Sequence, residues 1–382
     1  MNVRFPLVVG SFLLTAACWG VYGPLLHVGQ EALGGNRLRA FLCVGLAYFL
    51  IAVVIPIAMM STAGKKSTWS AKGLFWSLTA GTAGALGALG VILAFNFGGK
   101  PVYVMPLVFG CAPVVNSFWT IYWQKTWKDI NAFFAAGLIL VAVGAASVLF
   151  FAPTKTPAKS AAATPAEKGG TATAPAGTAA AAGKPSPAPP STQQLLLYVV
   201  PSIALTACCW GVYGPLLHWG QMGLGGNRLQ AFLCVGLAYF GVAVIVPAAL
   251  LGGAVAEGWS TSGIFWSLLG GAAGAFGALG IIFAFNFGGK PVYVMPLVFG
   301  CAPVVNAFVT IYKQGTWGDV NVFFAAGLIL AAVGAMSVLF FAPVQHKPAG
   351  AEAPAKTPPA QPESSPEAAA EETPAAGEQT PT

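Results

Sequence analysis

The chain contains an internal duplication, and this constrains its fold more than any other feature. The segment NFGGKPVYVMPLVFGCAPVVN at 96–116 recurs unchanged at 286–306, and CWGVYGPLLH at 18–27 recurs at 209–218. Whatever structure the first copy adopts, the second copy must therefore adopt a closely related one.

Each copy contains five apolar stretches that are long enough to cross a bilayer. A transmembrane helix needs about 20 apolar residues, and these stretches are continuously apolar rather than alternating, which favours helices over a β-barrel. We predict spans at 6–28, 38–60, 73–98, 102–123 and 130–152, and again at 196–219, 229–251, 263–288, 292–312 and 320–342. The predicted fold class is an all-α integral membrane protein with ten transmembrane helices.

The composition excludes a soluble globule. Of the 382 residues, 56% are hydrophobic and only 8% are charged, whereas soluble domains have about 25% charged residues. The net charge of +7 is spread between apolar runs instead of being clustered, so no nucleic-acid partner is expected. The cysteines all lie in apolar stretches and are interpreted as small core residues: Cys18, Cys43, Cys111, Cys208, Cys209, Cys234 and Cys301.

Two segments have a different composition. Residues 154–194 are rich in Ala, Pro and Thr, and residues 344–382 are rich in Pro, Ala and Glu. Neither segment can bury enough apolar surface to offset chain entropy, so we expect both to be disordered. The predicted organisation is a first repeat at 1–153, a linker at 154–194, a second repeat at 195–343 and a tail at 344–382.

The odd number of spans in each copy predicts that the two copies lie upside down relative to each other in the bilayer. With the N-terminus in the cytoplasm, the positive-inside rule is satisfied in the first copy. In the second copy, three of the cytoplasmic lysines of the first are replaced by Ser262, Gly315 and Gly318. Ten spans then place both termini on the cytoplasmic side of the cell membrane.

Small residues and prolines recur at matching places in the two copies. Glycines at three-residue spacing in the third span of each copy predict close helix packing, with a sliding face as the alternative: Gly81, Gly84, Gly87, Gly90, Gly271, Gly274, Gly277 and Gly280. Prolines predict kinks, which are either ordinary bends or the wall of a central cavity: Pro24, Pro56, Pro106, Pro113, Pro215, Pro247, Pro296 and Pro303.

A few polar or aromatic side chains in the spans are candidates for contact with a solute. They are Trp19, Tyr22, Asn96 and Asn116, with their copies Trp210, Tyr213, Asn286 and Asn306. Aromatic walls with a few amides suit a small polar solute, although the same residues could serve helix packing or the membrane interface. The cationic residues present in both copies are expected to gate a pathway or attract a solute: Arg37, Lys100, Arg228 and Lys290.

The spans lack Asp and Glu in their central parts. Buried carboxylates are the usual proton relays and cation sites of transporters, so proton coupling and cationic solutes are disfavoured. The chain also lacks HExxH, GxSxG, CxxC and GxxxxGK[ST] motifs. We therefore expect neither an enzyme nor a bound cofactor or metal.

The order of these features resembles the drug/metabolite transporter (DMT) superfamily, in particular its EamA-like ten-helix members. The resemblance rests on Trp19-Gly20 in the first span, AFNFGG at 94–99, MPLVFGCAPVV at 105–115 and AAGLILVAVG at 135–144. It implies a ten-helix basket of two inverted five-helix repeats around a central site reached alternately from each side. The chain departs from relatives that carry a Gly-Glu pair after the fourth helix, because it has Gln124-Lys125 there.

The expected function is secondary transport of a small neutral polar or anionic solute by uniport or exchange, with the lipid bilayer and the solute as the partners. The alternative is a membrane scaffold without transport activity, whose linker and tail bind other proteins. The solute, the direction, any coupling ion and the oligomeric state are left open by the sequence.

Overall fold

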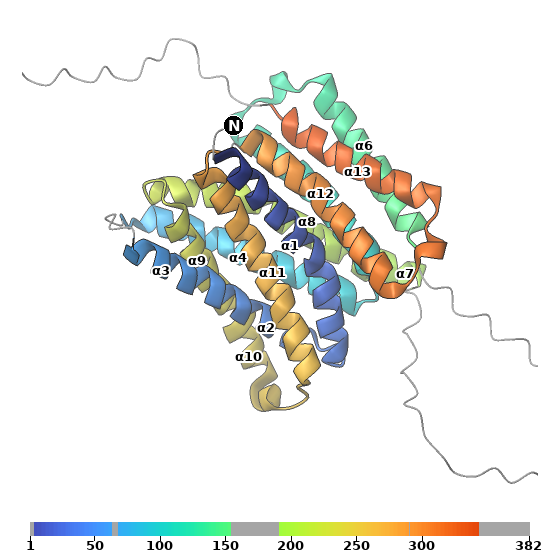
Figure 1. Cartoon of the computed structure of the whole chain (residues 1–382), viewed down its shortest axis with the longest axis horizontal. Helices are drawn as coiled ribbons and strands as arrows, with labels where there is room; N and C mark the ends of the chain where they lie inside the picture. The colour runs from blue at the N-terminus through green and yellow to red at the C-terminus, as the bar shows by residue number, and fades with distance from the viewer. Residues whose placement is uncertain (1–3, 63–67, 154–190, 290, 344–382) are drawn as a thin grey trace, which may run out of the picture. The chain divides into compact units, whose positions relative to one another are not determined.

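The computed structural model describes residues 4–62, 68–153, 191–289 and 291–343, without the side chains of residues 4, 62 and 291–293 (Figure 1). Within these ranges every regular element is helical, so the predicted all-α class is confirmed. Most of the predicted linker and the predicted tail lie outside the described residues, and their disorder stays a prediction.

The helices of the two copies correspond, although in the described residues the second copy has three additional short elements, α7, η3 and η5. The first has α1 (Arg4–Ala32), α2 (Arg37–Phe49), the π-helical turn η1 (Leu50–Val54), α3 (Ile55–Thr62), α4 (Ala71–Asn96), α5 (Pro101–Gln124), the 3-10 turn η2 (Trp127–Asp129) and α6 (Ala132–Phe151). The second has α7 (Thr192–Gln194), η3 (Leu195–Val199), α8 (Val200–Gly223), α9 (Arg228–Phe240), η4 (Gly241–Ile245), α10 (Val246–Leu251), η5 (Gly252–Ala256), α11 (Thr261–Asn286), α12 (Pro291–Gln314), η6 (Trp317–Asp319) and α13 (Val322–Phe340).

Ten helices in the described residues are long and apolar enough to cross a membrane, as predicted. They are Phe5–Ala32, Arg37–Ser61, Ala71–Asn96, Pro101–Gln124, Ala132–Phe151, Thr192–Gly223, Arg228–Ala256, Thr261–Asn286, Val294–Gln314 and Val322–Phe340. The chain is thus built as a multi-pass membrane protein.

The sixth of these helices begins earlier than predicted. Ser191 caps it through a reciprocal pair of hydrogen bonds, in which the Gln194 amide donates to Ser191 Oγ (3.2 Å) and the Ser191 amide donates to Gln194 Oε1 (3.0 Å). This capping box satisfies two amides that a helix start would otherwise leave unpaired. The helix therefore includes residues 192–194, which the sequence assigns to the linker, with Ser191 as its N-cap.

Each of the three π-helical turns in the described part of the chain ends two residues before a proline. They precede Pro56, Pro201 and Pro247. A proline inside a helix has no amide hydrogen and its ring collides with the carbonyl four residues earlier. A wider turn relieves this collision while the helix continues, so at Pro56 and Pro247 the predicted interruptions take the form of π turns.

The long helices of each copy pack against those of the other copy. Thr15 Oγ1 of α1 donates to the Gly277 carbonyl of α11 at 3.0 Å, and further along α1 the Leu33 side chain lies against Gly263. Residue numbers rise along α1 where they fall along α11, so the two helices are antiparallel (Figure 1). Thr206 Oγ1 of α8 donates to Gly87 of α4 at 3.0 Å in the equivalent antiparallel pair.

The predicted glycine stripes form the surface on which this packing occurs. A Cβ atom added at Gly277 would overlap the Trp19 indole, and one added at Gly87 would overlap the Trp210 indole. The stripes thus let backbones and bulky rings approach closely, as expected for association in lipid. The structure therefore shows the glycine stripes in close helix packing, the first of the two predicted roles.

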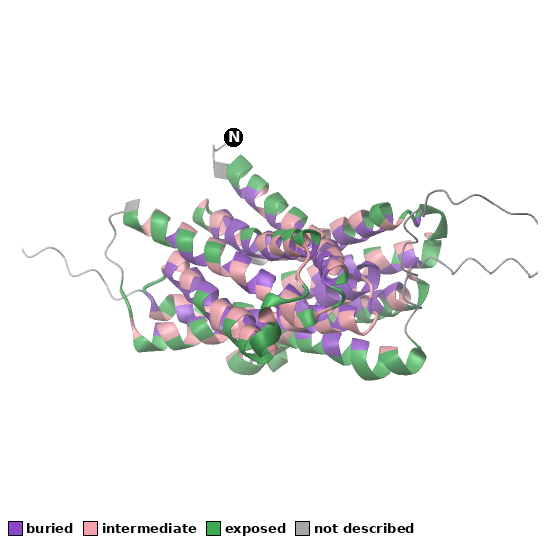
Figure 2. Ribbon diagram, turned by 90° about the horizontal axis from the view of Figure 1, so that it is seen from below, coloured by how far each residue is buried: buried purple, intermediate pink, exposed green. Residues whose placement is uncertain are grey.

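Burial follows this arrangement (Figure 2). Buried residues gather between the helices, while large apolar side chains such as Phe75, Phe133 and Phe265 are exposed on the outer faces. At one edge of the bundle α6 and α13 lie side by side, joined by hydrogen bonds from Asn131 Nδ2 to the Phe341 carbonyl and from Asn321 Nδ2 to the Phe151 carbonyl (both 3.0 Å). Apolar outer faces suit a bundle surrounded by lipid.

We predict that Gly277→Ala lowers the free energy of unfolding by about 1–3 kcal/mol, because the new methyl group must displace the Trp19 indole in a close-packed contact. The measurement is the apparent unfolding temperature in detergent. Gly10→Ala in α1 is the control, since no atom lies within 4 Å of its added Cβ. Equal stability of both variants and the unchanged chain would contradict the close contact.

Candidate functional site

The two predicted tryptophans join helices of different copies. Trp19 Nε1 donates to the Gly274 carbonyl of α11 at 3.2 Å, and Trp210 Nε1 donates to the Gly84 carbonyl of α4 at 3.1 Å. Each indole therefore uses its only hydrogen-bond donor within the protein. In this structure a solute could therefore contact the two indoles only through their rings.

These rings belong to one aromatic cluster in the centre of the bundle. Phe109 of α5 lies between the tryptophans, with ring centroids 6.4 Å from Trp19 and 6.3 Å from Trp210. Tyr22 lies 6.0 Å from Trp210, and Phe299 of α12 lies 6.0 Å from Trp19. The structure thus brings together predicted residues from both copies, with the two phenylalanines as additional members.

Two tyrosines that the sequence analysis missed complete the centre. Tyr48 of α2 and Tyr239 of α9 stack with ring centroids 3.8 Å apart and ring planes 6° from parallel. A Cβ at Gly274 would lie 3.0 Å from Tyr48 and 3.4 Å from Tyr22, so those two rings share one neighbour. In the same way, a Cβ at Gly84 would lie 3.1 Å from the Tyr239 ring and 3.4 Å from that of Tyr213.

The tyrosines bring hydroxyl groups into the aromatic cluster. The Tyr22 hydroxyl is buried and has no hydrogen-bond partner among the described residues. A buried hydroxyl without a partner costs free energy, and a polar ligand could relieve that cost. One signal in the sequence could have identified Tyr48 and Tyr239, because a tyrosine occurs at the same place in the second span of both copies.

The two predicted asparagines also bond to the backbone of neighbouring helices. Asn116 Nδ2 donates to the Gly211 carbonyl of α8 at 3.1 Å, and Asn306 Nδ2 donates to the Pro101 carbonyl of α5 at 2.7 Å. Asn306 is fully buried, and its Oδ1 has no partner among the described residues. Both amides therefore lie on helix contacts.

The remaining predicted residues lie at helix ends. Arg228, at the start of α9, donates from Nη1 to Asn286 Oδ1 at the end of α11 (3.1 Å). Its guanidinium also lies 5.6 Å from the centre of the Phe285 ring. Arg37 is exposed at the start of α2, and Asn96 is half-buried at the end of α4.

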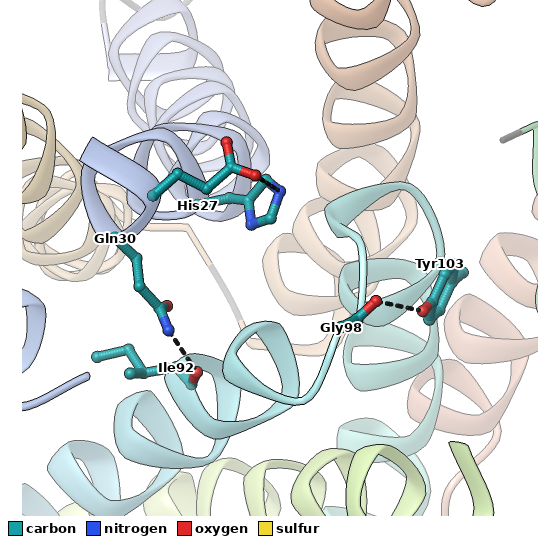
Figure 3. A network of polar contacts seen from close by, with 6 residues as sticks. His27, Gln30, Ile92, Gly98 and Tyr103 are labelled. Atoms are coloured by element: carbon teal, nitrogen blue, oxygen red, sulfur yellow. Dashed lines mark hydrogen bonds and ion pairs between the residues drawn. The ribbon is translucent and has the colours of Figure 1, made fainter. Parts of the chain in front are cut away.

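Lys100 occupies the N-cap position of α5, while its copy Lys290 lies outside the described residues. The same end of the bundle holds His27 (Figure 3), which lies 3.4 Å from Glu31. His27 also packs edge-on against Phe95. The candidate site thus consists of an aromatic and amide centre, with cationic groups at the ends of the helices.

A separate apolar groove of about 390 Å³ lies along α5 and η2. Its lining consists of Val114, Val115, Phe118, Trp119, Tyr122 and Trp127. The groove contains none of the predicted site residues. Its exposed Tyr122 and Trp127 match the aromatic belts that membrane proteins place at the lipid–water interface.

The described residues contain no group of three His, Cys, Asp or Glu side chains arranged to hold a metal ion. No family of known proteins matches the chain in a scan against family models, and a search of curated proteins finds no match either.

We predict that Trp19→Phe lowers the free energy of unfolding by about 1 kcal/mol in the absence of any solute, because the substitution removes the bond to Gly274 and keeps an aromatic ring. Thermal unfolding in detergent measures the change. Trp127→Phe is the matched control at an exposed position. If both variants were as stable as the unchanged chain, the indole bond would have no structural role.

Proposed function

We propose that the chain is a secondary transporter in the cell membrane, which moves a small neutral polar or anionic solute by alternating access through uniport or exchange. We also propose, from the resemblance of its spans, that it is an EamA-like member of the DMT superfamily. No enzymatic step and no cofactor is part of this proposal.

The observation that supports the proposal best is the antiparallel packing of α1 on α11 and of α4 on α8. As first and third spans of one copy, α1 and α4 cross the bilayer in the same direction. The third span of the second copy, α11, is antiparallel to α1 and thus opposite to α4. This supports two inverted repeats, the architecture in which many transporters place a solute site at the repeat interface.

The chemistry of the centre supports the class of solute. The rings of Trp19, Trp210 and the four tyrosines offer aromatic surfaces and uncharged hydroxyl groups. Such groups bind polar or ring-containing solutes through hydrogen bonds and stacking. Arg37 and Arg228 occupy equivalent positions, so in inverted copies they would face opposite sides of the membrane and attract an anion from either side.

The inverted arrangement predicts that equivalent loops face opposite compartments. Trp127 and Trp317 are equivalent, and each is 49% exposed. We expect a membrane-impermeant maleimide to label Trp127→Cys from the cytoplasmic side and Trp317→Cys from the other side. The unchanged chain, with its native cysteines inside the spans, gives the background. Labelling of both variants from one side would overturn the inversion.

The transport proposal is tested with the purified full chain in liposomes. A thermal-shift screen with sugars, nucleotides, amino acids and organic anions first selects compounds that stabilise the protein, because a ligand stabilises the state that it binds. Uptake of the selected radiolabelled compound is then measured. We expect Asn116→Ala combined with Asn306→Ala to reduce uptake about tenfold, since each amide bonds a helix of one copy to a helix of the other and so helps to set their relative position.

Ile139→Ala combined with Ile329→Ala is the matched control, because both isoleucines are exposed at equivalent positions of α6 and α13. This pair should transport as the unchanged chain does. A stable protein that takes up none of the compounds would favour the scaffold over the transporter.

A further inference from the structure

Identical sequence segments have different surroundings in the two copies. Residues 96–116 and 286–306 have the same sequence, yet Met105 is fully buried while its copy Met295 is half-buried. Leu107 is also less exposed than its copy: it is half-buried, whereas Leu297 is 36% exposed. Because the two segments are identical, the difference comes from the elements packed around them.

The two asparagines of these segments show the same difference in their hydrogen bonds. Asn116 donates to the carbonyl of Gly211 in α8, and the equivalent partner of Asn306 would be Gly20 in α1. Instead, Asn306 donates to the carbonyl of Pro101, the first residue of α5, at 2.7 Å. The first turn of α5 is thereby held against α12.

Further contacts close the same end of the bundle. The Met105 side chain fills the space beside Gly23, where an added Cβ would overlap it. Gln30 Nε2 at the end of α1 donates to the Ile92 carbonyl near the end of α4 at 3.2 Å (Figure 3). His27 packs on Phe95 with ring centroids 5.1 Å apart. We call this set of contacts the α1 end.

The equivalent positions in the second copy are more open. Gly214, the copy of Gly23, is exposed, and among the described residues the one atom that an added Cβ would approach within 4 Å is Asn116 Nδ2 at 3.1 Å. His218 is exposed, and Gln221 and Phe285 are half-buried. We call this region the α8 end. One sequence unit thus adopts a closed arrangement at the α1 end and an open arrangement at the α8 end.

From this asymmetry we propose that Asn306 and Asn116 are a pair of exchanging latches, an inference that rests on the proposed transport function. In the structure Asn306 closes the α1 end through Pro101. In the opposite state Asn116 donates to the Pro291 carbonyl and closes the α8 end, while Asn306 donates to Gly20. Met295 then packs beside Gly214, and Met105 becomes accessible.

The physical reason is that both copies carry the same residues at these contacts. Either arrangement of the repeat is therefore available to either copy at similar free energy, and a small difference in bonding decides which end is closed. The hydrogen bond of the closed end is shorter than that of the open end, 2.7 Å against 3.1 Å, and it lies on a fully buried side chain. Removing one asparagine should favour the state in which the other forms the latch.

The test compares Met105→Cys and Met295→Cys, which have identical neighbours in sequence. The full-length variants are reconstituted in liposomes, and a membrane-impermeant maleimide is present on both sides. We expect Met295→Cys to react faster than Met105→Cys. Adding Asn306→Ala should raise the Met105→Cys rate and lower the Met295→Cys rate, changing their ratio about threefold to tenfold, as expected for one hydrogen bond in a membrane. Adding Asn116→Ala should change the ratio in the opposite direction.

Equal labelling rates of the two cysteines would overturn the latch. So would a ratio of the two rates that both asparagine variants shift in the same direction, or that neither variant changes. Should Asn306→Ala fail to fold, Asn306→Ser serves instead, because its hydroxyl can bond within its own helix but is too short to replace the amide. The labelling needs no solute. A shifted ratio in a protein without uptake therefore contradicts the transport proposal alone, and uptake with an unshifted ratio contradicts the latch alone.

Discussion

The close contact between the glycine stripes and the indoles of the other copy determines most of this structure. A helix in lipid gains little from burying apolar side chains, because lipid tails are equally apolar. Association then depends on backbones that approach closely and on hydrogen bonds across the contact. Both occur where Trp19 packs on Gly277 and donates to Gly274, and where Trp210 does the same on α4. The core of the protein is therefore the boundary between the copies.

The ten helices were predictable because their signal is local: continuous apolar stretches of sufficient length, bounded by capping residues such as Asn36 and Ser70. The form of the interruptions was less predictable. A proline predicts that a helix must adjust, but whether the adjustment is a kink or the π turn found before Pro56 depends on the packing of neighbouring helices. The start of the sixth span was predicted too late because the capping box at Ser191 follows a stretch without large apolar side chains.

The sequence predicted several residues of the candidate site, but it did not predict which contacts they make. Trp19, Tyr22 and Trp210 meet in one cluster, yet their partners come from helices that are distant in the sequence. The difference between Asn116 and Asn306 could not have been predicted, since identical segments cannot reveal that they have different surroundings. The different hydrogen-bond partners of the two asparagines depend on how the two copies pack against each other. They are therefore a property of the whole bundle.

The serines that begin the third span of each copy couple the two halves in another way. Ser260 Oγ accepts from the Gly263 amide and donates to the Ala32 carbonyl of α1, and Ser70 makes the same two bonds, to the Gly73 amide and the Gly223 carbonyl of α8. Each serine hydroxyl thus caps the start of its own helix and also bonds that helix to a helix of the other copy. Expressed as two separate polypeptides, the halves would each lack a folding partner, and only co-expression would yield a complete molecule.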